Sequence, residues 1–98
     1  MRILIVEDET RLAETLRDVF SEKNYNVTLE FDGVSGYDEA ASGVYDAILL
    51  DVMLPGMDGF ELVRKLRAER VPTPVLLLTA RSETMDRVYG LDCGADYY

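Results

Sequence analysis

Three carboxylates, Glu7, Asp8 and Asp51, follow directly after apolar runs of the sequence. The runs, residues 3–6 and 47–50, are hydrophobic throughout, which is typical of strands covered on both faces of a parallel sheet. Because ligands bind outside the carboxyl ends of such strands, two adjacent strands would bring the three acids into one cleft. Like charges at short range raise one another's pKa unless a cation shares them. Since Mg²⁺ prefers oxygen ligands, the cluster predicts a magnesium site with one carboxylate left for chemistry.

The elements that must position these acids alternate along the chain as strands and helices. Strands are expected over residues 2–6, 25–31, 46–50 and 75–78. Apolar residues at helical spacing predict helices over residues 10–22, 34–42 and 58–69, and a fourth that begins at Ser82 and ends at Cys93. Helix-length connections imply right-handed crossovers and a doubly wound parallel α/β sheet. A strand order beginning 2-1-3-4 would place the first and third strands, and hence the acids, side by side.

The composition restricts the classes of partner. The 98 residues suffice for one domain, and 48% hydrophobic with 30% charged residues is ordinary for a globular chain. A formal net charge of −9 disfavours direct contact with nucleic acid or with an anionic membrane. The acidic balance fits the binding of a cation or of a basic partner.

The cellular compartment is indicated by the cysteine content and by the first residues. Cys93 is the single cysteine and the chain has no histidine, so neither an internal disulfide nor a Cys/His metal site is expected. Met1 and Arg2 lead directly into a four-residue apolar run, which is far shorter than a signal sequence or a membrane span. We therefore expect a cytoplasmic location.

Several short motifs, in order along the chain, resemble the receiver domain of two-component response regulators. They are Glu7-Asp8, the stretch DVMLPGMDG at residues 51–59, LTAR at residues 78–81, DRVYGL at residues 86–91 and GAD at residues 94–96. The last two are similar to the subfamily that carries a winged-helix DNA-binding domain further on. The resemblance runs over residues 1–98 and implies a flavodoxin-like, three-layer α/β/α fold with strand order 2-1-3-4-5.

The resemblance also implies a role for each acid. Asp51 would be the phosphoacceptor, which attacks a phosphohistidine on a sensor histidine kinase to form an aspartyl phosphate. Glu7 and Asp8 would hold Mg²⁺ together with Asp51, and the backbone carbonyl of Met53 would complete the protein's ligands. Phosphoryl transfer requires positioning and neutralised charge, which such a metal supplies.

Further residues would serve the phosphoryl group and the switch that it drives. By the same resemblance, the Thr79 hydroxyl would bind a phosphoryl oxygen, and the small Ala80 would leave room beside that group. Tyr98 would be the aromatic that rotates when Thr79 moves inward, which shifts the domain between two existing states. Pro55 and Gly59 would shape the loop after Asp51 without taking part in the chemistry.

The sequence departs from the family at its end. The family's phosphate-binding lysine lies three residues beyond the position of Tyr98, so residues 1–98 are expected to be the first four-fifths of a receiver domain, without most of strand 5 and helix 5. Arg87 matches a charged position on the dimerisation face at helix 4, whereas Tyr97 replaces an acid of that face. Left at a sheet edge, the strand at residues 75–78 would expose unpaired backbone, so self-association through that edge or through the helix 4 face is expected.

The same residues leave more than one function open. The main hypothesis is a signalling module that assists its own phosphorylation, is not an enzyme for free substrates, and controls transcription in the intact protein. The alternative is a protein-binding module of the same fold that is not phosphorylated. A flavin or nucleotide enzyme would need a phosphate-cradling loop rich in small residues, but residues 7–10 are Glu-Asp-Glu-Thr.

Overall fold

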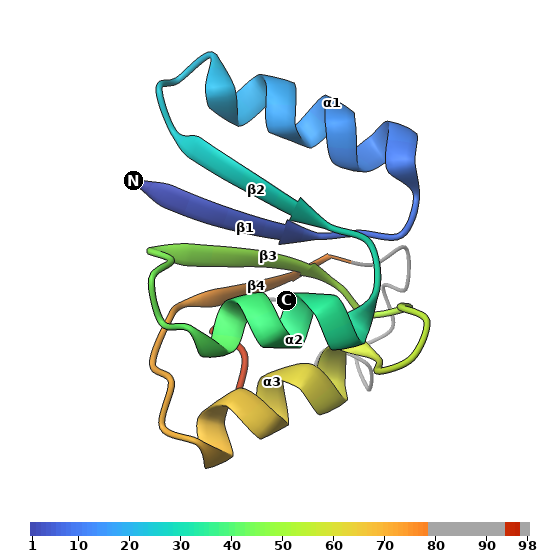
Figure 1. The fold of residues 1–98 in the computed structure, drawn as a ribbon, viewed down its shortest axis with the longest axis vertical. Coiled ribbons are helices and arrows are strands. Elements are labelled where there is room, and N and C mark those ends of the chain that lie inside the picture. Colours follow the sequence, from blue (N-terminus) through green and yellow to red (C-terminus); the bar gives the residue numbers. More distant parts are fainter. Residues whose placement is uncertain (79–93, 97–98) are drawn as a thin grey trace.

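A parallel sheet forms the centre of the computed structural model, which describes residues 1–78 and 94–96. Its four strands are β1 (Arg2–Val6), β2 (Asn26–Glu30), β3 (Ala47–Asp51) and β4 (Val75–Leu78). They lie in the order β2-β1-β3-β4, and every neighbouring pair is parallel (Figure 1). The predicted order is confirmed, and β1 and β3 are adjacent.

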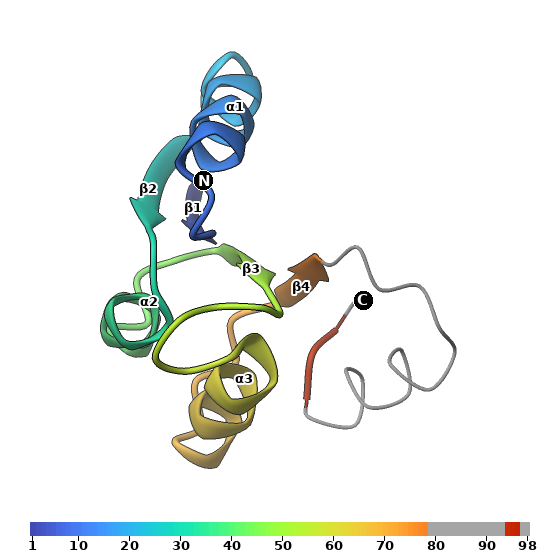
Figure 2. The same cartoon turned by 90° about the vertical axis from the view of Figure 1, so that its right-hand side faces the viewer.

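Helices cover both faces of this sheet. They are α1 (Thr10–Ser21), α2 (Gly33–Ala41) and α3 (Gly59–Ala68). Figure 2 shows α1 on one side of the strands and α2 with α3 on the other. The three layers confirm the predicted flavodoxin-like α/β fold, while the fourth helix expected from Ser82 lies outside the described residues.

Side chains of alternating strand positions enter two separate cores. Ile3, Ile5 and Leu49 pack with Leu16 and Phe20 of α1. Their neighbours along the strands face the other way and pack with α2 and α3 in a larger core, which includes Leu4, Val6, Ile48, Leu50, Phe60, Leu62 and Leu66. Because β1, β3 and β4 are covered on both faces, they have no polar alternation, which explains their uninterrupted apolar runs.

The element boundaries differ from the predicted ones by one or two residues. Asp51 is the last residue of β3 and pairs with Leu78 of β4, so it belongs to the strand that it was expected to follow. Helix α2 begins at Gly33, one residue early, because the Asp32 carboxylate accepts a hydrogen bond from the Ser35 amide at 2.7 Å and caps the helix. These shifts leave the register of the sheet unchanged.

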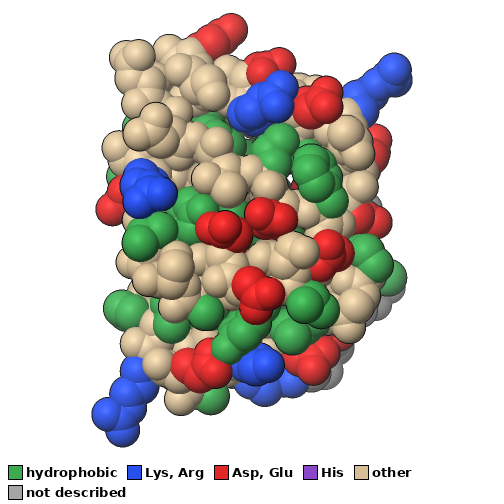
Figure 3. Space-filling view, in the orientation of Figure 1, with side chains coloured by type: hydrophobic (Ala, Val, Ile, Leu, Met, Phe, Trp, Pro, Cys, Tyr) green, Lys and Arg blue, Asp and Glu red, His purple; other side chains and the backbone are tan. Residues whose placement is uncertain are grey.

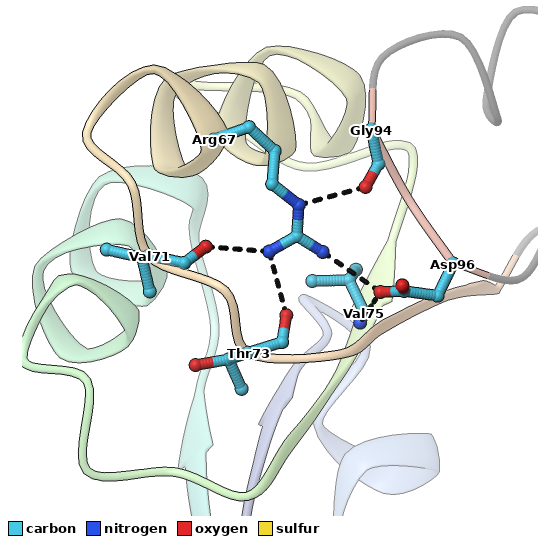
Figure 4. Close-up of polar contacts among 6 residues, drawn as sticks. All are labelled: Arg67, Val71, Thr73, Val75, Gly94 and Asp96. Atoms are coloured by element: carbon cyan, nitrogen blue, oxygen red, sulfur yellow. Dashed lines mark hydrogen bonds and ion pairs between the residues drawn. The ribbon is translucent and has the colours of Figure 1, made fainter.

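Arg67, near the end of α3, joins separate backbone segments through its guanidinium group (Figure 4). Nη1 donates to the carbonyl oxygens of Val71 at 2.7 Å and Thr73 at 2.9 Å, and Nε donates to that of Gly94 at 2.9 Å. A planar guanidinium carries several donors in a fixed fork, so one side chain can serve these acceptors at once. The connection between α3 and β4 is thereby tied to residues 94–96.

Asp96 completes this arrangement at the outer edge of β4. Its carboxylate accepts from Arg67 Nη2 at 2.9 Å and from the Val75 amide at 2.8 Å. The Asp96 amide donates to the Val75 carbonyl at 3.1 Å. We call Arg67, Asp96 and these bonded backbone groups the Arg67 clamp. The expectation that the outer edge of β4 exposes unpaired backbone is therefore wrong at Val75, where both backbone groups have partners.

Candidate metal centre

The carboxyl ends of β1 and β3 bring the three predicted acids together. Val6 pairs with Leu50, so Glu7 and Asp51 leave neighbouring strands at the same level. The Glu7 amide donates to the Glu30 carbonyl at 3.0 Å, which continues the pairing of β1 with β2 by one residue and fixes the Glu7 backbone. One carboxylate oxygen each from Glu7, Asp8 and Asp51 lies within 4.8 Å of the other two. We call these three residues the acidic cluster.

The members of the acidic cluster differ in exposure. Glu7 is buried, Asp51 is half-buried and Asp8 is exposed. Neither the ion pair Arg17–Asp18 nor the pair Arg67–Asp96 includes a member of the cluster. Figure 3 shows further acidic side chains distributed over the face of the molecule in view, in keeping with the net charge of −9. The cluster is therefore a like-charged group that runs from the surface into the interior.

Glu7, the buried member of the cluster, has a strongly shifted pKa. Burial raises the pKa of Glu7 from 4.5 to about 8, and the hydrogen bond to Asp51 and the negative charges of Asp51 and Asp8 act in the same direction. A pKa of about 8 favours the protonated form of Glu7 at neutral pH, which can donate its hydrogen bond to Asp51. A divalent cation placed among these oxygens would replace the proton and satisfy all three carboxylates. A set of ligands made only of oxygen atoms suits a small hard ion such as Mg²⁺, which keeps several water ligands of its own.

The loop after Asp51, residues 52–58, contacts the acidic cluster through its backbone. The Met53 amide donates to Asp51 Oδ1 at 3.2 Å, while the Met53 side chain is 63% exposed. At the other end of the loop, the Gly59 amide donates to the Val52 carbonyl at 2.8 Å. A Cβ at Gly59 would lie 2.5 Å from the carbonyl oxygen of Asp51, so only glycine lets α3 begin this close to the strand end.

Other predicted site residues are placed only in part. Thr79, Ala80, Arg87 and Tyr98 lie outside the described residues. The carbonyl of Met53 stays a predicted ligand, because the contact found here is made by its amide.

Sequence reasoning assigned neither Arg67 nor Gly33 to a site. A basic residue in the last turn of a helix is ordinary, because it suits the helix dipole. Gly33 donates its amide to the Pro55 carbonyl at 3.0 Å, a contact between segments that are 22 residues apart in the sequence. Only the three-dimensional packing reveals either contact.

Over residues 1–78 and 94–96, no helix has the length and the apolar character needed to cross a bilayer.

Comparisons with known proteins agree with this geometry. Residues 3–98 match the family of response regulator receiver domains. The response regulator ArlR of Staphylococcus aureus (strain Mu50 / ATCC 700699) is 50% identical over 97 residues, which are 99% of this chain and 44% of that protein. The chain thus spans less than half the length of this relative.

Solved structures show the same arrangement of elements. The BeF3-activated N-terminal receiver domain of Klebsiella pneumoniae RstA matches with a TM-score of 0.93 at 32% identity, over 100% of this chain and 83% of that one. The receiver domain of the sensor histidine kinase PA1611 from Pseudomonas aeruginosa PAO1, with magnesium coordinated in its active site cleft, matches with a TM-score of 0.89 at 34% identity. That match covers 99% of this chain and 81% of the other.

A parallel sheet in the order β2-β1-β3-β4 with acids at the ends of β1 and β3 defines a receiver fold with a candidate metal centre. The chain belongs to the response regulator receiver domain family. Receiver domains of this family act in two-component signalling, a role distinct from that of an enzyme for free substrates.

Proposed function

We propose that this chain accepts a phosphoryl group from a sensor histidine kinase onto Asp51 in a Mg²⁺-dependent reaction. The observation that carries the proposal is the acidic cluster, whose carboxylate oxygens lie within 4.8 Å of one another at the carboxyl ends of β1 and β3. Asp51 is the half-buried member, so its carboxylate can meet a reactant, and the Met53 amide donates to its Oδ1 atom. A module of the same fold that is not phosphorylated is the alternative.

The metal would be held by Glu7, Asp8 and Asp51, with the carbonyl of Met53 as a further ligand. When bound, Mg²⁺ supplies positive charge that neutralises the carboxylates and the phosphoryl oxygens. An Asp51 oxygen attacks the phosphorus atom of the phosphohistidine, a P–O bond forms and the P–N bond breaks. The electron pair of the broken bond stays on the imidazole nitrogen. Asp51 thus becomes an aspartyl phosphate.

Residues near the end of β4 would respond to the phosphorylation of Asp51. By resemblance to the family, Thr79 donates its hydroxyl to a phosphoryl oxygen, Ala80 leaves space for that group, and Tyr98 rotates with Thr79. Pro55 and Gly59 keep the loop after Asp51 in place, and the close approach of Gly59 to the carbonyl of Asp51 supports this role. The switched surface then controls an output.

The intact protein is proposed to be a regulator of transcription. The chain covers 44% of ArlR, so the output would lie in further sequence of the kind that follows a receiver domain. Residues 1–98 would be the first four-fifths of the receiver domain. The receiver domain itself would make no direct contact with nucleic acid. We also predict self-association, either through the helix 4 face near Arg87 or through the part of the β4 edge beyond Val75. A cytoplasmic location stays a prediction.

The direct test uses acetyl phosphate as the phosphodonor, with intact mass as the readout. We expect a Mg²⁺-dependent gain of one phosphoryl group that disappears in Asp51→Asn. Asp58→Asn is the matched control, because Asp58 lies in the same loop and caps α3 by accepting from the Glu61 amide at 2.8 Å, a role that asparagine also fills. No gain in the unaltered protein would favour the module that is not phosphorylated, and an equal gain in Asp51→Asn would exclude Asp51 as the acceptor.

A further inference from the structure

We propose that the first turn of α2 is a positioning element of the metal centre, because it holds the loop after Asp51 and the end of β1 in a fixed relation. This inference rests on the proposed function of the acidic cluster. We call Gly33, Val34 and Gly36 the α2 brace. None of these residues contributes a ligand atom, and each acts through backbone or side-chain contact with a segment that carries ligands.

The first contact of the α2 brace is with the loop. The Gly33 amide donates to the Pro55 carbonyl at 3.0 Å. A Cβ at Gly33 would lie 1.8 Å from the carbonyl oxygen of Met57 and 2.7 Å from its carbonyl carbon. These are backbone atoms, which cannot rotate away as a side chain can. Gly33 has no positive φ, so glycine is required there by the lack of space and not by the backbone conformation.

The second contact is with the end of β1. Gly36 lies one helical turn after Gly33, on the same side of α2. A Cβ at Gly36 would lie 2.6 Å from Cγ1 and 2.8 Å from Cγ2 of Val6, which directly precedes Glu7. Helix α2 therefore lies close both to β1, which directly precedes the predicted ligand Glu7, and to the loop that follows Asp51, and its approach to the loop is the closer of the two.

The loop transmits its position to the acidic cluster. Gly56 turns with φ +83°, and a Cβ there would lie 3.3 Å from Cγ2 of Val34. Three residues before Gly56, the Met53 amide donates to Asp51 Oδ1 at 3.2 Å. A displacement of about 1 Å at a positioned group is enough to impair a site. If the added methyl group of Gly33→Ala pushes the loop outward, the Met53 backbone must move relative to Asp51.

The simpler explanation is that the glycines only allow α2 to pack on the sheet. In that case a substitution would lower the stability of the fold and leave the folded site unchanged. Gly43 provides the control, because it follows the far end of α2, has φ +74°, and a Cβ there would meet nothing within 4 Å. Gly43→Ala strains the backbone without touching the loop or β1.

The experiment compares Gly33→Ala with Gly43→Ala in the folded protein. We expect Gly33→Ala to weaken Mg²⁺ binding at least tenfold by calorimetry, and Gly43→Ala to change it less than twofold. In the metal-free protein, we expect the Met53 amide to exchange its hydrogen faster in Gly33→Ala than in Gly43→Ala, after correction for the change in the free energy of global unfolding in each variant. Equal Mg²⁺ affinity and equal Met53 protection in the two variants would overturn the inference.

A second pair of variants serves if Gly33→Ala does not fold. Asp32 caps α2 by accepting from the amide and the hydroxyl of Ser35 at 2.7 and 3.0 Å. Asp32→Ala loosens the first turn, whereas Asp32→Asn keeps a cap, and both remove the same charge. We expect Mg²⁺ to bind Asp32→Ala at least threefold more weakly than Asp32→Asn, and equal binding would overturn the inference.

The proposed function and the α2 brace can fail separately. Absence of Mg²⁺ binding by the unaltered protein would overturn the proposed function. The protection of the Met53 amide, measured without metal, would still show whether the first turn of α2 holds the loop after Asp51.

Discussion

The acidic cluster and the Arg67 clamp both contain charged side chains at the margin of one sheet, but the charges are matched by opposite charge and hydrogen bonds only in the clamp. In the clamp, one guanidinium donates to three carbonyl oxygens and one carboxylate, and that carboxylate also accepts from the Val75 amide. In the cluster, three carboxylates lie close together, and neither the Arg17–Asp18 nor the Arg67–Asp96 ion pair includes them.

This difference separates a structural role from a binding role. Matched charges and satisfied hydrogen bonds stabilise the fold, and their removal leaves unpaired groups behind. Burial, the hydrogen bond to Asp51 and the unmatched charges of Asp51 and Asp8 raise the pKa of Glu7 to about 8, which costs stability until a ligand binds. The clamp is complete without a partner, whereas the cluster becomes complete when a cation binds.

The largest expected effect comes from breaking the clamp. We expect Arg67→Gln to lower the free energy of unfolding by about 3 kcal/mol, because several carbonyls and the Asp96 carboxylate lose a charged donor. Urea denaturation measures this loss. Arg17→Gln is the control, because Arg17 forms an exposed pair with Asp18 and should cost below about 0.5 kcal/mol. Equal losses in the two variants would remove the structural role of the clamp.

The next effect has the opposite sign and comes from the acidic cluster. The folded pKa of Glu7 lies above its unfolded value of 4.5, so its contribution is favourable below pH 4.5 and is lost as the pH rises through about 8. We therefore expect Glu7→Gln to raise the free energy of unfolding at pH 8 without metal by about 2 kcal/mol, with allowance for water around the exposed Asp8. At pH 4 the gain should vanish.

Urea denaturation at the two pH values, with a chelator present, checks this sign. Glu14→Gln on the exposed side of α1 removes the same charge away from the cluster and should change little. A destabilised Glu7→Gln at pH 8 would contradict the account of unmatched charge.

The smallest effect concerns an acid near the cluster that has its own partner. Asp58 accepts from the Glu61 amide at 2.8 Å, so Asp58→Ala should destabilise the protein by about 1 kcal/mol through loss of a helix cap. Asp58→Asn should restore most of that loss in thermal unfolding. If neither variant differs from the unaltered protein, the cap contributes nothing and the contrast between paired and unpaired acids becomes weaker.

The sequence predicted the fold and the acidic cluster for one physical reason. Strands buried on both faces read as uninterrupted apolar runs, and the crossover rule then places their acidic ends together. The end of β3 was predicted one residue early because Asp51 is polar although it still pairs with Leu78. The start of α2 was predicted one residue late because the cap at Asp32 outweighs the low helix propensity of Gly33.

The clamp and the α2 brace could not be predicted in the same way. Arg67 binds backbone carbonyls, which every residue has, and its partner Asp96 lies 29 residues further along the chain. The glycines of α2 are needed because backbone atoms and Val6 occupy the space beside them, and such crowding leaves no periodic pattern in a sequence.

The central claim is that the acidic cluster holds a proton in the place of a cation. The most direct measurement is the number of protons released when Mg²⁺ binds at pH 7, obtained by calorimetry in two buffers of different ionisation enthalpy. Because the pKa of Glu7 is about 8, the account predicts release of close to one proton in the unaltered protein. It predicts almost none in Glu7→Gln. Binding of Mg²⁺ without proton release in the unaltered protein would contradict it.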